Sequence, residues 1–214
     1  GARLDELEPN VRTVAAWLSP STGIFDSHDY MLSLLGEMES SGGMIAFHSS
    51  VVGGRVTDNG IEIETGGEAP MVLSCDALVN AGGLGAQGLA NRIAGIPFDT
   101  IPPLYYARGH YFTLAGKCPF NHLVYPVPVA GGLGTHSSID LGGQVKFGPD
   151  VEWIEEVDYT VDPARGDKFY ADIRRYWPEL PDGALQPGYA GIRPKLTGPE
   201  GGKYGTDFMI QGPT

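Results

Sequence analysis

The apolar residues of the first fifty positions predict a helix followed by a strand. Four of them between residues 31 and 38 recur at the spacing of one helix face, and Asp26 or Ser27 precedes them as a capping residue. A glycine pair at 42–43 ends the pattern. The apolar run 44–47 then predicts a short buried strand.

The next fifty residues alternate between strand and turn patterns. Apolar and charged residues alternate over Ile61–Glu64 after the turn signal Asn59-Gly60, and residues 71–73 can return against that strand. The uninterrupted apolar run 77–81 predicts a strand covered on both faces. A glycine-rich turn and a helix over 86–93 follow, so this region predicts an α/β layer.

After Pro97 the pattern changes to short strands separated by glycine and proline, which favours a mixed or antiparallel sheet. Asp162 and Pro163 form a helix start, and the apolar stripe that follows ends at Trp177-Pro178. The expected strands are residues 105–114, 123–127, 133–139, 144–147, 189–192 and 208–210, and the expected buried stripe is Phe169, Ile173, Tyr176 and Trp177.

Composition excludes several classes of protein. With 14 Lys and Arg against 26 Asp and Glu, the net charge is −12, which argues against a nucleic acid as partner. No apolar run approaches the roughly 18–20 residues that cross a bilayer. The 32 glycines and 17 prolines are about twice the ordinary share, which indicates many tight turns. Cys75 and Cys118 have no zinc or disulfide pattern, so we interpret them as free thiols in a reducing compartment.

Residues 83–88 match G-x-G-x-x-G, the dinucleotide-binding pattern. The acidic residue that should follow about 20 positions later is Asp99, but prolines at 97, 102 and 103 leave no room for the second strand. The complete Rossmann fingerprint is therefore rejected. Either these glycines touch another part of a nucleotide or the turn is structural.

Three residues have surroundings that favour chemistry. Arg193 stands in Gly-Ile-Arg-Pro-Lys, a motif that places its guanidinium rigidly to bind a carboxylate. The alternative is that Arg193 forms a surface salt bridge. His136 follows a glycine run and is the best placed proton acceptor, although a lone histidine is more often structural. Tyr125 begins the rigid segment Tyr-Pro-Val-Pro, which is a pocket wall or an edge strand.

Other chemistries are unsupported by the sequence. His110 alternates with large aromatic residues on a strand, and no two histidines have the spacing of metal ligands. Ser137 lacks the G-x-S-x-G pattern of an acyl-transfer nucleophile. No metal is therefore expected.

The order of seven motifs resembles one known family. The series resembles the FAD-dependent oxidoreductases of the D-amino-acid oxidase superfamily, and most closely their L-2-hydroxyglutarate dehydrogenase/oxidase branch. The likeness covers nearly the whole chain. The motifs are residues 21–26 (STGIFD), 78–83 (LVNAGG), 108–112 (RGHYF), 122–128 (HLVYPVP), 132–136 (GLGTH), 146–150 (KFGPD) and 191–195 (GIRPK).

This resemblance implies FAD as cofactor and an α/β (α+β overall) chain in two parts. Residues 1–100 are expected to form a partial FAD-binding Rossmann-like domain, and residues 101–214 a substrate domain with a mixed or antiparallel sheet. Members of the family bind FAD through an N-terminal βαβ fingerprint, and their C-terminal segment returns to the flavin. Neither segment is in this sequence, so we expect it to be an internal fragment.

The resemblance also assigns residues. It implies cofactor contacts along Val51 and Val52, and at the segment Asn80, Ala81, Gly82 and Gly83. Arg193 would pair with the substrate carboxylate and Tyr125 would orient it, while His136 is the candidate base. His110 and Tyr111 are expected beside the substrate. The pair Ser137-Ser138 departs from the family's Leu-Thr, which would alter the substrate.

The implied reaction is oxidation of a small 2-hydroxy carboxylic acid, such as L-2-hydroxyglutarate, by hydride transfer to flavin. The alternatives are an amino-acid or sarcosine-type oxidase and a non-catalytic fragment unable to hold FAD by itself. The electron acceptor is left open among oxygen, a quinone and a carrier protein. The expected location is the cytoplasm, or the periphery of the inner membrane.

Overall fold

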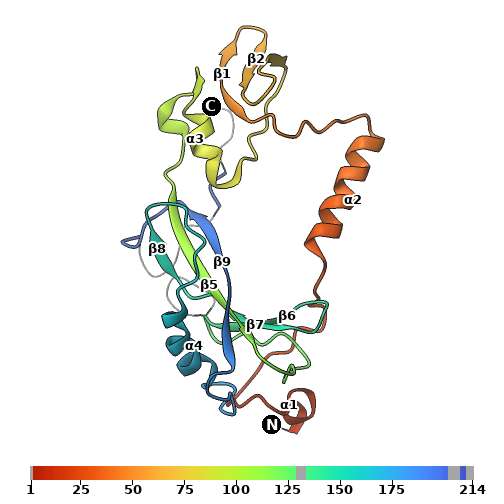
Figure 1. The fold of residues 1–214 in the computed structure, drawn as a ribbon, viewed down its shortest axis with the longest axis vertical. Coiled ribbons are helices and arrows are strands. Elements are labelled where there is room, and N and C mark those ends of the chain that lie inside the picture. The colour runs from red at the N-terminus through yellow and green to blue at the C-terminus, as the bar shows by residue number, and fades with distance from the viewer. Residues whose placement is uncertain (1, 129–133, 202–207, 211–214) are drawn as a thin grey trace. The chain divides into compact units, whose positions relative to one another are not determined.

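The structure is a computed structural model that describes residues 2–128, 134–201 and 208–210 (Figure 1). The chain forms two compact units. The larger unit comprises Gly1–Ser27, Tyr106–Arg193 and Gly198–Thr214, and the smaller unit comprises His28–Tyr105 and Pro194–Thr197. The expected boundary lies at residue 100, but the first 27 residues belong to the larger unit. The mixture of helices and two sheets agrees with the predicted fold class.

The smaller unit is built on a four-stranded sheet of order β3-β2-β1-β4. β1 and β2 form an antiparallel hairpin in which Thr57 pairs with Gly60, and this confirms the turn predicted at Asn59-Gly60. Gly60 has φ +131°, a conformation that favours glycine. The strands are β1 (Val51–Thr57), β2 (Gly60–Thr65), β3 (Val72–Cys75) and β4 (Ile93–Ala94).

The predicted first helix is present as α2 (Ser27–Ser40), but its apolar stripe is not buried in the described structure. Met31 and Leu34 are half exposed on it. The glycine turn forms a short 3-10 segment, η1 (Gly83–Gly85), which leads into α3 (Ala86–Ala90). A second 3-10 segment, η2, covers Phe98–Thr100.

Two predicted strands of this unit are wrong. Residues 44–47 and 77–81 form no strand, and Met44 and Val79 are 92% and 87% exposed. An apolar run indicates a covered environment, but it supplies no neighbouring strand with which to pair. The predicted helix over 86–93 is shorter than expected, because Ile93 belongs to β4 and is buried beside β1.

The larger unit holds a five-stranded sheet in which β5 is central (Figure 1). The order is β6-β7-β5-β8, and β9 also pairs with β5. The strands are β5 (Tyr105–Leu114), β6 (His136–Ile139), β7 (Val145–Gly148), β8 (Glu152–Ile154) and β9 (Leu185–Lys195). The helical segments are α1 (Ala2–Leu7), η3 (Pro163–Arg165) and α4 (Gly166–Ile173).

β7 and β8 both pair antiparallel with β5, in registers that differ by one residue. Phe112 lies opposite Phe147, whereas Arg108 lies opposite Glu152. The extra residue lies in the segment 149–151, which is a local bulge between the two pairings.

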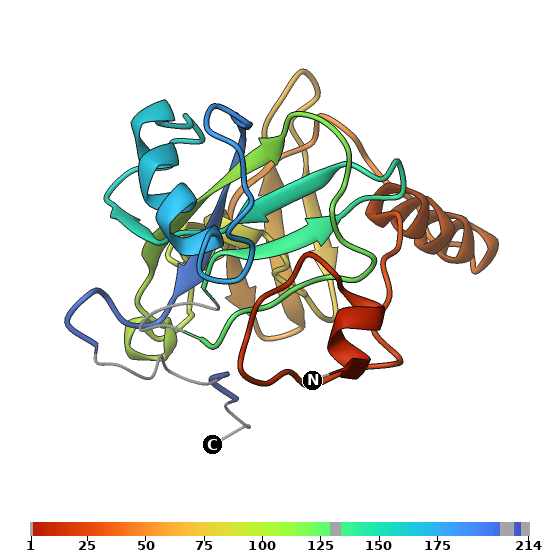
Figure 2. The same ribbon diagram turned by 90° about the horizontal axis from the view of Figure 1, so that it is seen from below.

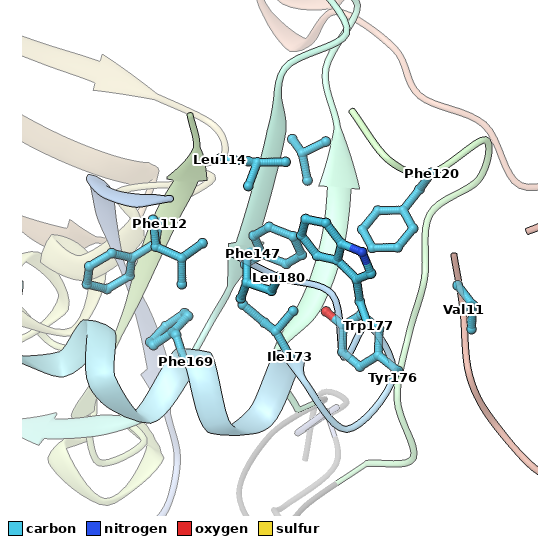
Figure 3. Close-up of a cluster of buried hydrophobic side chains, with 12 residues drawn as sticks. Val11, Phe112, Leu114, Phe120, Phe147, Phe169, Ile173, Tyr176, Trp177 and Leu180 are labelled. Atoms are coloured by element: carbon cyan, nitrogen blue, oxygen red, sulfur yellow. The ribbon is translucent and has the colours of Figure 1, made fainter. Parts of the chain in front are cut away.

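One face of this sheet packs against α4 (Figure 2). Phe112 and Phe169 meet with ring centroids 4.7 Å apart, and Trp177 stacks on Phe147 at 6.2 Å. Figure 3 shows these rings with Ile173 in a single buried cluster. The predicted buried stripe from Phe169 to Trp177 is therefore confirmed.

The predicted start of this helix is also confirmed. The Asp162 carboxylate accepts a hydrogen bond of 2.9 Å from the Ala164 N–H, and Pro163 occupies the first helical position.

Two strand predictions fail in the larger unit, and one strand was not predicted. Residues 123–127 form only the isolated bridge between Val124 and Ser137, and residues 208–210 form no strand. β8 was missed, because three residues are too few to show a period. Leu133, at the start of another predicted strand, lies outside the described residues.

Phe169→Ala tests the importance of this packing. Because Phe169 is fully buried, its truncation should lower the free energy of unfolding by about 3–5 kcal/mol in urea titrations. Lys168→Ala, on the exposed side of the same helix, is the control and should change it by less than about 0.5 kcal/mol. Equal losses in the two variants would contradict this assignment of the core.

Candidate active site

The face of the sheet opposite α4 carries polar aromatic side chains. Tyr111 points to this face because it alternates with the buried Phe112 along β5. Its ring stacks on that of Tyr189 from β9, with centroids 4.6 Å apart and planes 10° apart. At Gly148 of β7, a Cβ would lie 2.7 Å from the Tyr111 ring, and φ is +148°. Any larger residue at position 148 would clash with the Tyr111 ring, so glycine is required for that ring to lie across β7.

Arg193 acts on Tyr111 from the end of β9. Burial raises the pKa of Tyr111, and Tyr189 raises it further, while the charge of Arg193 and a hydrogen bond to it have the opposite effect. Tyr111 is therefore a neutral hydroxyl beside a guanidinium at neutral pH.

His136, at the start of β6, is buried and oriented. Its ring stacks on that of Tyr125 with centroids 4.2 Å apart and planes 8° apart. Its Nδ1 lies 3.2 Å from the carbonyl oxygen of Gly134, and a carbonyl can only accept a hydrogen bond. Nδ1 therefore carries the hydrogen, which leaves a lone pair on Nε2.

The surroundings of His136 also keep it neutral. Burial lowers the pKa of its imidazole below 6.5, and the positive charge of Arg193 lowers it further, against the opposing hydrogen bond to Gly134. A neutral imidazole with a free Nε2 lone pair can accept a proton at pH 7.

These residues form one group, which we call the aromatic–arginine cluster: Tyr111, Tyr125, His136, Tyr189 and Arg193. Four of its members were predicted as site residues from the sequence. Tyr189 was missed, although its place four residues before Arg193 on one strand puts both on the same face.

His110 lies apart from this cluster, contrary to its expected place beside the substrate. Its side chain has no exposed surface, and both its backbone N–H and its Nδ1 contact the Asp150 carboxylate, at 2.8 and 3.0 Å. The reason is the period of two in a strand, which sends His110 to the α4 side when Tyr111 faces the other way.

The residues expected to contact the cofactor belong to the smaller unit. Asn80 closes the glycine turn, because its amide donates to the Ala86 carbonyl at 2.8 Å and its Oδ1 accepts from the Gly82 N–H at 3.2 Å. Gly83 has φ +56° and no atom within 4 Å of its Cβ position. Val52 is half exposed on β1, and its carbonyl accepts a hydrogen bond from Arg92.

This open glycine turn fits a backbone contact with a dinucleotide. It does not fit a diphosphate-binding βαβ turn, because residues 77–82 form no strand before it. Within the described ranges, no three His, Cys, Asp or Glu side chains are grouped to hold a metal ion. No described helix has both the length and the apolar character needed to cross a bilayer.

Comparisons with known proteins define the class of this chain. Residues 1–213 match the family model of the FAD dependent oxidoreductases named DAO, and the chain belongs to this family. The predicted family and its cofactor, FAD, are thereby confirmed.

Two curated relatives carry the same description. The mitochondrial L-2-hydroxyglutarate dehydrogenase of Arabidopsis thaliana is 43% identical over 246 residues, covering 96% of this chain and 50% of that protein. The L-2-hydroxyglutarate dehydrogenase of Escherichia coli K12 is 28% identical, covering 97% of this chain and 57% of that protein. The chain thus spans about half the length of these relatives.

Solved structures share the fold. L-alpha-glycerophosphate oxidase from Mycoplasma pneumoniae, with FAD bound, matches with a TM-score of 0.72 and 20% identity, over 91% of this chain and 51% of that one. Glycine oxidase from Bacillus cereus matches with a TM-score of 0.67 and 18% identity, over 91% and 51% of the two chains.

Arg193→Gln tests the electrostatic coupling within the cluster. Loss of the guanidinium charge should raise the pKa of His136, which lies below 6.5 in the native protein. NMR titration of the His136 imidazole measures this shift. Arg12→Gln removes a charge paired with Glu179 and should leave the pKa of His136 in place. An unchanged pKa in Arg193→Gln would show that the two groups are not coupled.

Proposed function

We propose that this chain is part of an enzyme that oxidises a small 2-hydroxy carboxylic acid of the L-2-hydroxyglutarate type with FAD. The observation that carries the proposal is His136, a neutral base with a free Nε2 beside a guanidinium. The names of the two curated relatives support the substrate class. The larger unit would hold the substrate and the smaller unit would contact FAD.

Arg193 would bind the substrate carboxylate. A guanidinium can donate two parallel hydrogen bonds to the two carboxylate oxygens, which fixes both position and orientation. The hydroxyl of Tyr111, which shares a hydrogen bond with Arg193, would contact the same end of the substrate, and that of Tyr125 would orient it.

His136 Nε2 would take the proton of the substrate hydroxyl. Loss of that proton leaves an electron pair on the oxygen, which becomes the carbonyl oxygen of a 2-oxo acid as the Cα hydrogen leaves with its bonding electrons. FAD, when bound, supplies the acceptor of this hydride. Residues 80–83 and Val51–Val52 would contact FAD through their backbone.

Amino-acid or sarcosine-type oxidation is the alternative reaction. A neutral amine brings its own lone pair and needs no base, so His136 would be dispensable. Oxygen, a quinone and a carrier protein all stay open as final electron acceptor. The cytoplasm or the periphery of the inner membrane stays the predicted location.

His136→Asn separates the two reactions. In the FAD-loaded enzyme, kcat/KM for a 2-hydroxy acid should fall by about 10²–10⁴-fold, the usual contribution of a general base. In the native enzyme, kcat/KM should rise with pH as His136 loses its proton, with a midpoint below 6.5. His48→Asn is the matched control, because asparagine tolerates the positive φ at that position. Unchanged turnover in His136→Asn would favour amine oxidation.

The isolated 214-residue chain should bind FAD weakly, because its described glycine turn lacks the strand that a diphosphate-binding turn needs. The visible absorbance of the purified chain after addition of FAD and gel filtration measures this. A stoichiometric yellow protein would contradict the prediction.

A further inference from the structure

Lys146 shares the face of the sheet on which the aromatic–arginine cluster lies. It stands on β7 opposite Thr113 of β5 and Ser138 of β6. Directly paired residues of neighbouring strands point to the same side, and so do residues two apart on one strand. Lys146 is therefore on the side of Tyr111 and His136, and away from α4.

Its ammonium is in contact with the cluster. Nζ lies 5.6 Å from the centroid of Tyr189, whose ring stacks on that of Tyr111. The Lys146 side chain keeps 30% of its surface exposed.

Lys146 and Arg193 lie in opposite directions from the stacked tyrosines. Ala115 donates to the Ala184 carbonyl and Thr113 to that of Gln186, so β9 leads from the end of β5 toward its start. Arg193 follows Tyr189 by four residues in that direction, whereas Lys146 faces Thr113, toward the end of β5. The face thus carries a cation on each side of the stack.

These two cations stand out in a chain with a net charge of −12. Among the described residues Lys146 forms a salt bridge with Asp140, whose carboxylate is 3.5 Å from Nζ and 39% exposed. An ammonium has three donors, so this contact leaves capacity for a further anion. An exposed pair of this kind contributes little to stability.

We propose that Lys146 binds a second carboxylate and makes the site selective for 2-hydroxy dicarboxylates over 2-hydroxy monocarboxylates. This proposal rests on the proposed function, because it takes Arg193 as the group that binds the first carboxylate. With that carboxylate on Arg193 and the hydroxyl at His136, the far end of the substrate extends over the stacked tyrosines to Lys146. Their rings supply an apolar surface for the methylene groups between the two charges.

Lys146→Gln in the FAD-loaded enzyme tests the proposal. The two substrates are 2-hydroxyglutarate and 2-hydroxypentanoate, which has the same carbon chain without the second carboxylate. The variant should lose about 10- to 100-fold in kcat/KM for 2-hydroxyglutarate, mostly through KM, and little for 2-hydroxypentanoate. Lys146→Arg should keep much of the preference. Lys168→Gln removes a lysine charge from α4 and should leave the ratio of the two substrates unchanged.

The possible failures can be told apart. If the native enzyme oxidises both hydroxy acids and Lys146→Gln affects them equally, the second carboxylate site is refuted and the proposed function stands. If the native enzyme oxidises neither, the proposed function fails, and equilibrium binding decides about Lys146. Calorimetry with glutarate and pentanoate should then show weaker glutarate binding in Lys146→Gln alone, and an unchanged affinity would overturn the proposal.

Discussion

The packing of α4 against one face of β5 and β7 is the interaction on which the larger unit depends. Phe112, Phe147 and Phe169 are buried there with almost no exposed surface. Side chains alternate between the two faces along a strand. When apolar rings fill one face, the residues between them therefore point to the other face. The same strand that anchors the core through Phe112 therefore presents Tyr111 on the opposite side.

Partial burial sets the protonation of the cluster. It lowers the pKa of His136 and raises that of Tyr111, so both groups are neutral at neutral pH, one as an acceptor and the other as a donor. Arg193 supplies the positive charge of the cluster. An anionic ligand on this face would therefore meet positive charge beside neutral hydrogen-bonding groups, although the chain as a whole is acidic.

Local signals in the sequence predicted what local forces determine. The Asp162-Pro163 helix start and the hairpin at Asn59-Gly60 were predictable because a cap and a tight turn depend on a few adjacent residues. The apolar runs at 44–47 and 77–81 failed as strands, because strand formation requires a partner that the run does not encode.

The candidate site was predictable in part for the same reason. Arg193, Tyr125 and His136 stand in glycine- or proline-rich motifs that mark rigid backbone, and their order resembled a known family. The stacking of His136 on Tyr125 joins residues from different segments, so no pattern in either segment indicates it. The face on which His110 lies depends on which residues of β5 point to each side of the sheet. Its aromatic neighbours Tyr111 and Phe112 point to opposite sides, so the sequence pattern did not decide between the two faces.

The one-residue shift between β7 and β8 has an electrostatic consequence. In β7 the even-numbered Lys146 points toward the cluster, yet the even-numbered Glu152 of β8 lies on the other side, paired with Arg108 at 2.8 Å. Without this shift, all even-numbered residues from Lys146 to Glu152 would point to the same side of the sheet. Glu152 would then lie on the same face as Arg193. The bulge thus exchanges which positions face each side of the sheet, and it keeps the Glu152 carboxylate away from the face that carries Arg193.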